Sequence, residues 1–309
     1  MRKAEYAHAS ILHYDVRPRI RKRTCATLRE LGFRRIANVG DPHDLAGLVR
    51  TRQFEMVVFA VDGLDARAPA LVRQARHYEK SSDPYTPMIL VSWNGATDQV
   101  QQALNSGTDQ LLMWPFSTEQ LAARVDALIS ARKPFVETED YLGPDRRDQK
   151  SRDKGSDSVE VPNALRARIE RRPDLAPSQD AMLVARISLE RIKIGNVARR
   201  IGKIAKILRQ RGGEAHFVNN RAAVELAAIQ NSLAVIRKAL DITELDHMRS
   251  FCDAVERVTV QLAQTPAKLD AKGLALLEQT SLALRVAMEV DEDTAMAAVR
   301  LSGDVARAV

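Results

Sequence analysis

The sequence predicts an α/β doubly wound domain with a five-stranded parallel sheet, followed by an all-α helical bundle. In the first part of the chain, apolar runs of four to six residues alternate with amphipathic stretches of ten to fifteen residues. This alternation is typical of a parallel sheet whose two faces are covered by helices. From about residue 179 onward, apolar residues recur with a helical period, and no strand pattern interrupts them. The 309 residues are enough for two such domains.

Five apolar segments contain the expected strands. The segment that begins near residue 54 has no polar alternation, which indicates a strand with both faces buried. The second segment is expected to form only a short strand. Helical crossovers between parallel strands are right-handed, so a doubly wound fold follows from these connections. The segments are 11–18, 35–39, 54–63, 87–92 and 107–116.

Amphipathic stretches with recognisable ends separate the strands. The first helix is expected to end at Gly32, because a left-handed helix cap favours glycine. Pro69 lies near the first turn of the third helix, where proline is tolerated. Ser117 is a good N-cap for the last helix, and Gln120 stands at the capping-box position. The helices are expected at about 19–31, 41–49, 69–76, 97–105 and 118–131.

The order and spacing of four of these segments resemble the receiver domain of two-component response regulators, over residues 8–133. The segments read ILHYDVRP at 11–18, FEMVVFAVDG at 54–63, PMILVS at 87–92 and GTDQLLMWPF at 107–116. The resemblance implies a flavodoxin-like fold and a role in bacterial phosphorelay signal transduction. In this family, two acidic residues after the first strand and one at the end of the third bind a divalent cation. The third carboxylate then accepts the phosphoryl group.

Most of the groups that this chemistry requires are replaced. Asp15 matches the first acidic residue, but Val16 stands at the position of the second. Ala60 occupies the position of the phosphoacceptor, and Trp114 occupies that of a lysine. Phosphoryl transfer needs the cation and the lysine to offset charge on the phosphoryl oxygens. One carboxylate is too little for a hard cation that prefers several oxygen ligands. We therefore expect a degenerate phosphorylation pocket with no metal, in which Asp15 is the residual acid.

Other features of the family remain or change in ways that matter. Ser92 matches the hydroxyl position, and Pro115 is similar to the proline that follows a cis peptide bond in the family. Leu111 occupies the position of the aromatic switch. The indole of Trp114 is expected to fill or cover the space for a phosphoryl group. Asp15 has an alternative role as a turn-forming acid that caps the first helix. This combination predicts a pseudo-receiver that is retained for its protein-binding surfaces.

An alternative register would make Asp62 the phosphoacceptor. This reading needs a shift of two residues and places the acceptor beyond the end of the strand. The ungapped reading from Ala60 keeps the separation of Ser92 from Trp114 that the family shows. We therefore keep atypical phosphorylation at Asp62 as an alternative to the pseudo-receiver.

The stretch from residue 134 to 178 is expected to be a charged flexible linker. Acidic and basic residues alternate closely in it, and few large apolar residues are present to offset the entropy of ordering. The sequence YLGPDRR at 141–147 resembles a short segment that recurs after bacterial signalling domains. Two roles remain open for this segment: packing of Tyr141 on the preceding domain, or service as a docking motif.

Residues 179–309 are expected to form the helical bundle, and its first helix spans about 178–211. A seven-residue apolar repeat runs through this helix. The repeat is typical of a coiled-coil-like seam, interrupted by Glu190. Ile192 and Ile207 widen the stripe, so packing within one bundle is an open alternative to an oligomer seam. Further helices are expected at 215–240, 242–264, 266–290 and 292–308, as antiparallel neighbours. The possible oligomer seam consists of Leu183, Ile187, Ile194, Val197, Ile201, Ile204 and Leu208.

Charge allows a second kind of partner without requiring it. The formal net charge is +7, and the first helix of the bundle is basic over residues 186–211. A nucleic-acid-binding regulator that uses this helix is therefore an alternative to a protein-binding adaptor. We expect a protein partner, and a homodimer is a further possibility.

The sequence does not predict an enzyme or a cofactor. His216 and His247 lack the flanking residues of a phosphotransfer histidine, and glycine-rich phosphate loops are missing. Cys25 and Cys252 lie in separate helical patterns, as isolated buried thiols would. No apolar run approaches the length of a membrane span, and the first residues do not resemble a signal peptide. A cytoplasmic location is expected.

Overall fold

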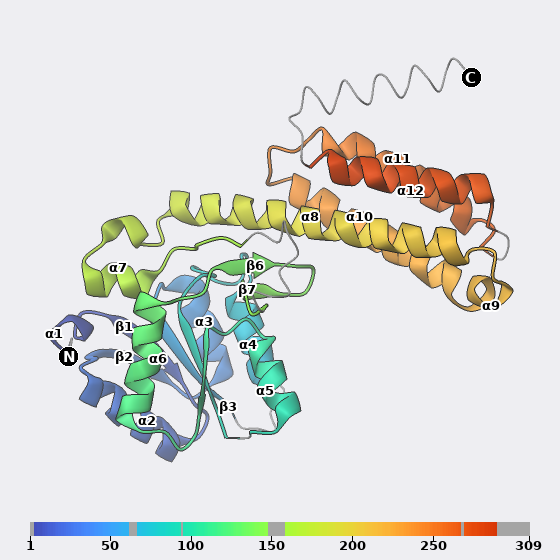
Figure 1. The fold of residues 1–309 in the computed structure, drawn as a ribbon. Helices are drawn as coiled ribbons and strands as arrows, with labels where there is room; N and C mark the ends of the chain where they lie inside the picture. Colours follow the sequence, from blue (N-terminus) through green and yellow to red (C-terminus); the bar gives the residue numbers. More distant parts are fainter. Residues whose placement is uncertain (1–2, 62–66, 94, 148–157, 267–268, 289–309) are drawn as a thin grey trace. The chain divides into compact units, whose positions relative to one another are not determined.

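A computed structural model describes residues 3–61, 67–93, 95–147, 158–266 and 269–288 (Figure 1). The chain divides into two compact units, Met1–Leu189 and Glu190–Val309, which are described separately. Among the described helices, none is both long enough and apolar enough to cross a membrane.

The first unit contains a five-stranded parallel sheet with the strand order β2-β1-β3-β4-β5. This is the flavodoxin-like order. All strands are parallel, and β2 lies on one side of β1 whereas β3, β4 and β5 follow on the other side, so the switch point lies between β1 and β3. The core strands β3 and β4 are buried along their described lengths, which explains the lack of polar alternation in their sequences. The predicted fold class of this part is confirmed. The strands are β1 (Ser10–Tyr14), β2 (Arg35–Val39), β3 (Met56–Val61), β4 (Met88–Ser92) and β5 (Gln110–Met113).

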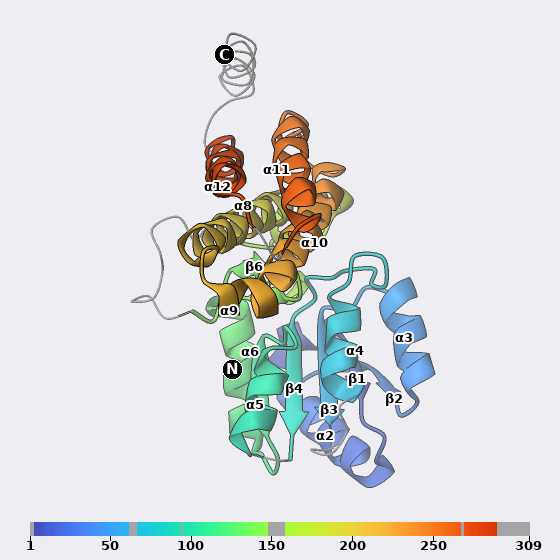
Figure 2. The same cartoon turned by 90° about the vertical axis from the view of Figure 1, so that its right-hand side faces the viewer.

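Helices cover both faces of this sheet (Figures 1 and 2). One hydrophobic cluster joins the sheet to α2 and α6, and a second joins the opposite face to α3, α4 and α5. The predicted caps are present: Gly32 ends α2 with a φ of 121°, and Ser117 forms a capping box with Gln120. The helices are α1 (Lys3–Tyr6), α2 (Pro18–Leu31), α3 (Pro42–Thr51), α4 (Arg67–Ala75), α5 (Thr97–Leu104) and α6 (Thr118–Ser130).

The expected flexible linker is wrong over most of its length, since residues 135–147 and 158–176 are folded and belong to the first unit. They form the antiparallel pair β6 (Phe135–Glu137) and β7 (Leu142–Pro144), helix α7 (Ala164–Glu170) and the short 3-10 helix η2 (Pro173–Leu175). Although the stretch has few apolar side chains, Phe135 and Leu165 are fully buried and pack in hydrophobic clusters of the first unit. Residues 148–157 lie outside the described residues.

A buried charge network fastens this extension to the amino edge of the sheet. Asp109, which directly precedes β5, accepts hydrogen bonds from Arg76 Nη2 at 2.7 Å and from Arg132 Nε at 2.7 Å. Both guanidiniums also lie over the ring of Phe135, at 5.0 and 4.8 Å from its centroid. Burial alone would raise the pKa of Asp109, but the guanidiniums of Arg132 and Arg76 hold it below its usual value. The stretch has few apolar side chains, and the contacts of Arg76 and Arg132 with Asp109 and Phe135 therefore help to attach it to the sheet.

The YLGPDRR segment forms part of the same attachment. Tyr141 donates a hydrogen bond to the Pro144 carbonyl at 2.8 Å, and Arg146 donates to the carbonyl of Thr108. Gly143 lies so close to Gly107 that a Cβ on Gly143 would come within 2.7 Å of the Gly107 Cα. The two chain segments pack backbone against backbone here, and the segment packs on the preceding domain.

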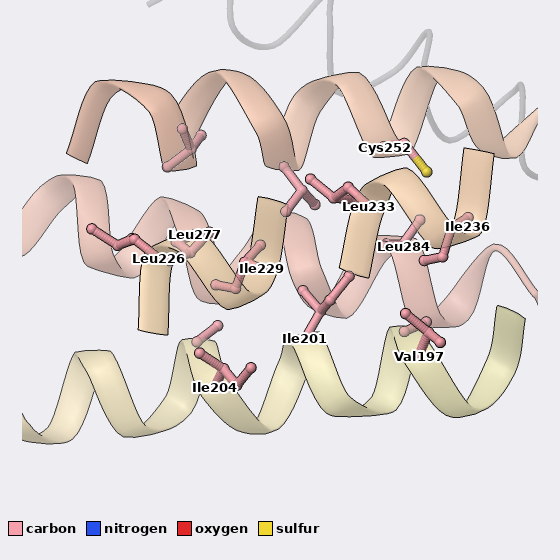
Figure 3. Close-up of a cluster of buried hydrophobic side chains, with 14 of the residues drawn as sticks. Val197, Ile201, Ile204, Leu226, Ile229, Leu233, Ile236, Cys252, Leu277 and Leu284 are labelled. Atoms are coloured by element: carbon pink, nitrogen blue, oxygen red, sulfur yellow. The ribbon is translucent and has the colours of Figure 1, made fainter. Parts of the chain in front are cut away.

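The second unit is a helical bundle built on the greater part of α8. Its core joins α8 to α10, α11 and α12 through buried aliphatic side chains (Figure 3). A π-helical turn, η3 (Val218–Ala222), follows the short α9 (Ala215–Phe217), so the expected helix 215–240 is not uniform. The expected helix 292–308 lies outside the described residues. The main helices are α8 (Gln179–Arg211), α10 (Ala223–Leu240), α11 (Met248–Ala263) and α12 (Ala271–Val286).

The possible oligomer seam is, for its greater part, the core of this bundle. Ile194, Ile201 and Leu208 are fully buried against other helices of the same chain. Val197 and Ile204 are also buried there, so the alternative of packing within one bundle is the one observed (Figure 3). Leu183 and Ile187 belong to the first unit, where Leu183 is exposed and Ile187 is half-buried. A repeat of seven cannot distinguish partners in the same chain from partners in another chain.

Candidate functional site

The carboxyl edge of the sheet brings the predicted pocket residues together. Asp15 and Val16 follow β1, and Ala60 lies near the end of β3, where it pairs in register with Val91 of β4. Ser92 ends β4, and its carbonyl accepts a hydrogen bond from Trp114 N at 2.8 Å. Ligands of doubly wound sheets bind in the crevice outside this edge. The alternative acceptor Asp62 lies outside the described residues.

Asp15 is fully buried, and an arginine from the following turn neutralises it. The Asp15 Oδ1 accepts hydrogen bonds from Arg17 N at 2.8 Å and from Arg17 Nε at 3.0 Å. Arg17 Nη2 lies 3.3 Å from the second carboxylate oxygen. Arg21 adds a hydrogen bond to the Asp15 carbonyl at 2.7 Å. The carboxylate therefore forms a turn and an ion pair, and its charge is compensated within the chain.

The same arginine begins a stack of cationic and aromatic groups. The Arg17 guanidinium lies 3.4 Å from the ring centroid of Trp93, and Trp93 stacks on Trp114 at 5.2 Å. Arg23 lies over the ring of Trp114 at 5.7 Å. We call these four side chains the arginine–tryptophan stack. Phe116 packs its ring edgewise against Trp114 at 5.1 Å. Cation–π contacts of this kind are each worth ~0.5–1 kcal/mol at partly exposed sites.

Two of the remaining pocket positions, Ala60 and Val16, carry no oxygen that could receive a phosphoryl group. Ala60 is buried and presents only a methyl group, and the exposed Val16 is apolar. Ser92 is buried beside them. The peptide bond between Trp114 and Pro115 is cis, as the family resemblance implies. Within the part of the chain that the structure describes, no three His, Cys, Asp or Glu residues are grouped as metal ligands.

One buried titratable group lies just behind the pocket. His13 of β1 is fully buried, and its Nδ1 lies 3.0 Å from Asn38 Oδ1 on β2. Burial lowers the pKa of His13 to about 4, against smaller opposing effects of Asn38 and Asp15. The imidazole is therefore neutral at pH 7.

Sequence reasoning did not identify Arg17, Arg23, Trp93 or Phe116 as parts of this site. A signal for Trp93 was present, because it directly follows Ser92 and so must lie at the carboxyl edge. The chain contains two tryptophans, and both stand at the ends of neighbouring strands. The direction of the Arg17 side chain after a tight turn carries no comparable signal.

Comparisons with known proteins find matches among solved structures. No protein-family model and no curated protein matches the chain. Among solved structures, the chemotaxis protein CheY4 of Vibrio cholerae is 18% identical, with 38% of this chain and 96% of that chain covered and a TM-score of 0.33. An orphan response regulator of H. pylori is 20% identical, with 39% and 96% covered and a TM-score of 0.33. A putative pilus assembly-related protein of Burkholderia pseudomallei is 17% identical, with 39% and 89% covered and a TM-score of 0.33. The strand order of the first unit is by itself that of a flavodoxin-like sheet.

Proposed function

We propose that this protein is a response-regulator-like signalling protein whose receiver unit acts without phosphorylation. In this proposal it is an adaptor that works through protein–protein contacts and catalyses no reaction. The observation that carries the proposal is the pairing of Asp15 with Arg17 under the arginine–tryptophan stack. A cation entering the pocket would have to displace Arg17 from Asp15, and no second carboxylate stands at position 16 or 60 to hold it.

Trp114 supports the same proposal from the other side of the pocket. A lysine at this position would supply a mobile positive charge for phosphoryl oxygens, whereas an indole offers an apolar face. Here that face is already covered by Trp93, and Phe116 packs against its edge. Because aromatic side chains fill the pocket without any phosphorylation, the surface of the unit should stay the same at all times. A constant binding surface suits an adaptor.

The proposal is tested with the full chain, Mg²⁺ and acetyl phosphate. Both tryptophans of the chain lie in the stack, so tryptophan emission reports on this pocket alone. We expect unchanged emission and an unchanged intact mass, and we expect the chain to capture the same protein partner before and after treatment. A stable acyl-phosphate adduct that changes the emission or the captured partner would overturn the proposal.

The same experiment separates the alternative at Asp62. An adduct that forms on the wild-type chain and is absent in Asp62→Asn would assign phosphorylation to that residue. The variant Ala60→Gly is the matched control, because it changes a residue of the same strand and leaves Asp62 in place. It should form the same adduct as the wild type.

The alternative of a nucleic-acid-binding regulator is less favoured by the described contacts of α8. Lys193 pairs with Glu190, and Arg211 pairs with Glu214. Arg209 pairs with Glu278 of α12. These partners reduce the positive potential that residues 186–211 suggest from sequence alone. A salt-dependent change in the electrophoretic mobility of duplex DNA or RNA on addition of the full chain would favour the nucleic-acid-binding alternative.

A further inference from the structure

A groove on the first unit lies at the amino edge of the sheet, at the opposite end of β3 from Ala60. Its volume is about 590 Å³, within the range of ~300–1,000 Å³ that is typical of small-molecule sites. Phe54 before β3 and two alanines of α7, Ala164 and Ala167, give it an apolar floor. Arg171, Pro173 and residues 176–178, which follow α7, form the other wall. We call it the amino-edge groove.

One arginine of the groove is held in place by the sheet. Arg168 Nε donates to Glu55 Oε1 at 3.0 Å. The other oxygen of Glu55 accepts a hydrogen bond from Ser10 N at 2.6 Å and a second from the Ser10 hydroxyl. Glu55 is therefore saturated by β1 and by Arg168, and its position fixes the Arg168 guanidinium at the groove wall.

A second arginine occupies a backbone position that disfavours it. Arg171 ends α7 with φ 55° and ψ 43°, and it is the one described residue other than glycine with a positive φ. Glycine is the usual residue at such a helix end, because a Cβ destabilises the left-handed conformation. The exposed Arg171 guanidinium has no hydrogen bond or ion pair among the described residues, although it lines the groove. A free cation thus stands where glycine would be less strained, and residues in strained conformations cluster at functional sites.

We propose that the amino-edge groove binds a small amphipathic carboxylate. The apolar part of the ligand lies on Phe54, Ala164 and Ala167, and its carboxylate pairs with Arg171, with Arg168 beside it. Charge selects this ligand, because two arginines line the groove and Glu55, the acid among its lining residues, is already bonded to Arg168. A bidentate arginine–carboxylate pair is among the stronger polar contacts available to a protein.

The position of the groove gives such binding a consequence. Pro177 and Ser178 line it and lead directly into α8 at Gln179. A bound carboxylate would therefore contact the residues at the start of the helix that continues into the second unit. This inference is independent of the proposed pseudo-receiver function, since it concerns the opposite edge of the sheet.

The test measures the binding of octanoate to the full chain by isothermal titration calorimetry. We expect one saturable site per chain, and we expect octanol, which has the same alkyl chain without the carboxylate, to bind at least tenfold more weakly. The variant Arg171→Gly should reduce octanoate affinity at least tenfold. Its melting temperature should not fall, because glycine removes the backbone strain together with the guanidinium.

Two further variants make the outcome decisive. Arg172→Ala is the matched control, because Arg172 pairs with Asp174 and does not line the groove. The affinity of this variant for octanoate should stay within twofold of that of the wild type. Ala176→Leu narrows the groove without a change of charge and should weaken octanoate. Absence of saturable binding to wild type, equal affinity for octanol, or an undiminished affinity of Arg171→Gly would each overturn the proposal.

Discussion

The pairing of Asp15 with Arg17 is expected to stabilise the carboxyl edge of the sheet. Replacing Arg17 by Ala leaves a fully buried carboxylate without its counter-charge and removes one end of the arginine–tryptophan stack. We expect a loss of ~3 kcal/mol in the free energy of unfolding, at the low end for a broken buried pair because Arg17 is 25% exposed. Urea unfolding followed by tryptophan emission measures it.

Two variants complete this measurement. The exposed Arg19 in the first turn of α2 gives the control, since Arg19→Ala should change stability by less than ~0.5 kcal/mol. Combining Arg17→Ala with Asp15→Asn should recover part of the loss, because the unpaired charge is then gone. Equal stability of Arg17→Ala and wild type would show that the pair contributes nothing.

His13 makes the first unit sensitive to mild acid. Its pKa is lowered from 6.5 to about 4 by burial, so the unfolded chain binds more protons than the folded chain between these values. The contribution of His13 is complete above pH 6.5 and is lost as the pH falls toward 4. The total is on the order of 3 kcal/mol.

Measuring unfolding free energies from pH 4.5 to 7.5 for wild type and His13→Gln isolates this contribution. Glutamine can keep a hydrogen bond to Asn38 but does not titrate. The stability of wild type relative to the variant should rise with pH across this range, and a constant difference would contradict the assignment.

At the scale of single residues, sequence reasoning predicted positions better than contacts. Asp15, Ala60, Ser92 and Trp114 meet at one edge because parallel strands end together, and strand ends are readable from apolar runs. The stack that joins them to Arg17 depends on side-chain directions in two turns, which no periodicity encodes.

At the scale of elements, the attachment of β6 and β7 was the largest departure from the sequence prediction. Low apolar content usually indicates a flexible segment, but here charges are satisfied inside the fold. Arg132 alone bonds Asp109 and the carbonyls of Tyr85 and Pro162. Composition cannot distinguish an arginine that faces water from one that is enclosed by acceptors.

The Asp109 network is therefore expected to be costly to break. Asp109→Asn removes the negative charge between two buried guanidiniums, and we expect a destabilisation of ~3–5 kcal/mol. The exposed Asp140 between β6 and β7 supplies the control, Asp140→Asn, with little expected change. Thermal unfolding by circular dichroism compares the two, and similar melting temperatures would contradict the role of the network.

Helix α8 provides the corresponding test in the second unit. Ile201 is fully buried in the bundle core, so Ile201→Ala should cost ~2–5 kcal/mol. Because its partners belong to the same chain, the sedimentation coefficient of the folded protein should not change. Dissociation of an oligomer by this substitution would favour the seam that the heptad repeat suggested.

At the scale of the whole molecule, the division between units falls inside a helix. Residues 179–189 of α8 belong to the first unit, where Ala185 and Leu189 are buried with Tyr85 and Phe135. The sequence placed the boundary before residue 179, since a helical period is the same whichever core it faces. Fold class was predictable for both parts, whereas the extent of each unit was not.

A comparison of two fragments tests this boundary. A fragment of residues 1–133 lacks Phe135, Leu165 and Ile169, which are buried in the first unit. We expect it to melt on the order of 10 °C below a fragment of residues 1–189, since several buried side chains lose their partners. Equal melting temperatures would restore the shorter domain that the sequence predicted.

The Asp15–Arg17 pair also limits which single substitutions the pocket accepts. An aspartate at position 60 would place a second carboxylate near Asp15, whose counter-charge Arg17 is already engaged. A lysine at position 114 would remove the ring that Trp93 stacks on and add a cation next to Arg23. Each of these substitutions alone loses contacts that the pocket now has. A new carboxylate and a new ammonium group would therefore enter this pocket more easily together than one at a time.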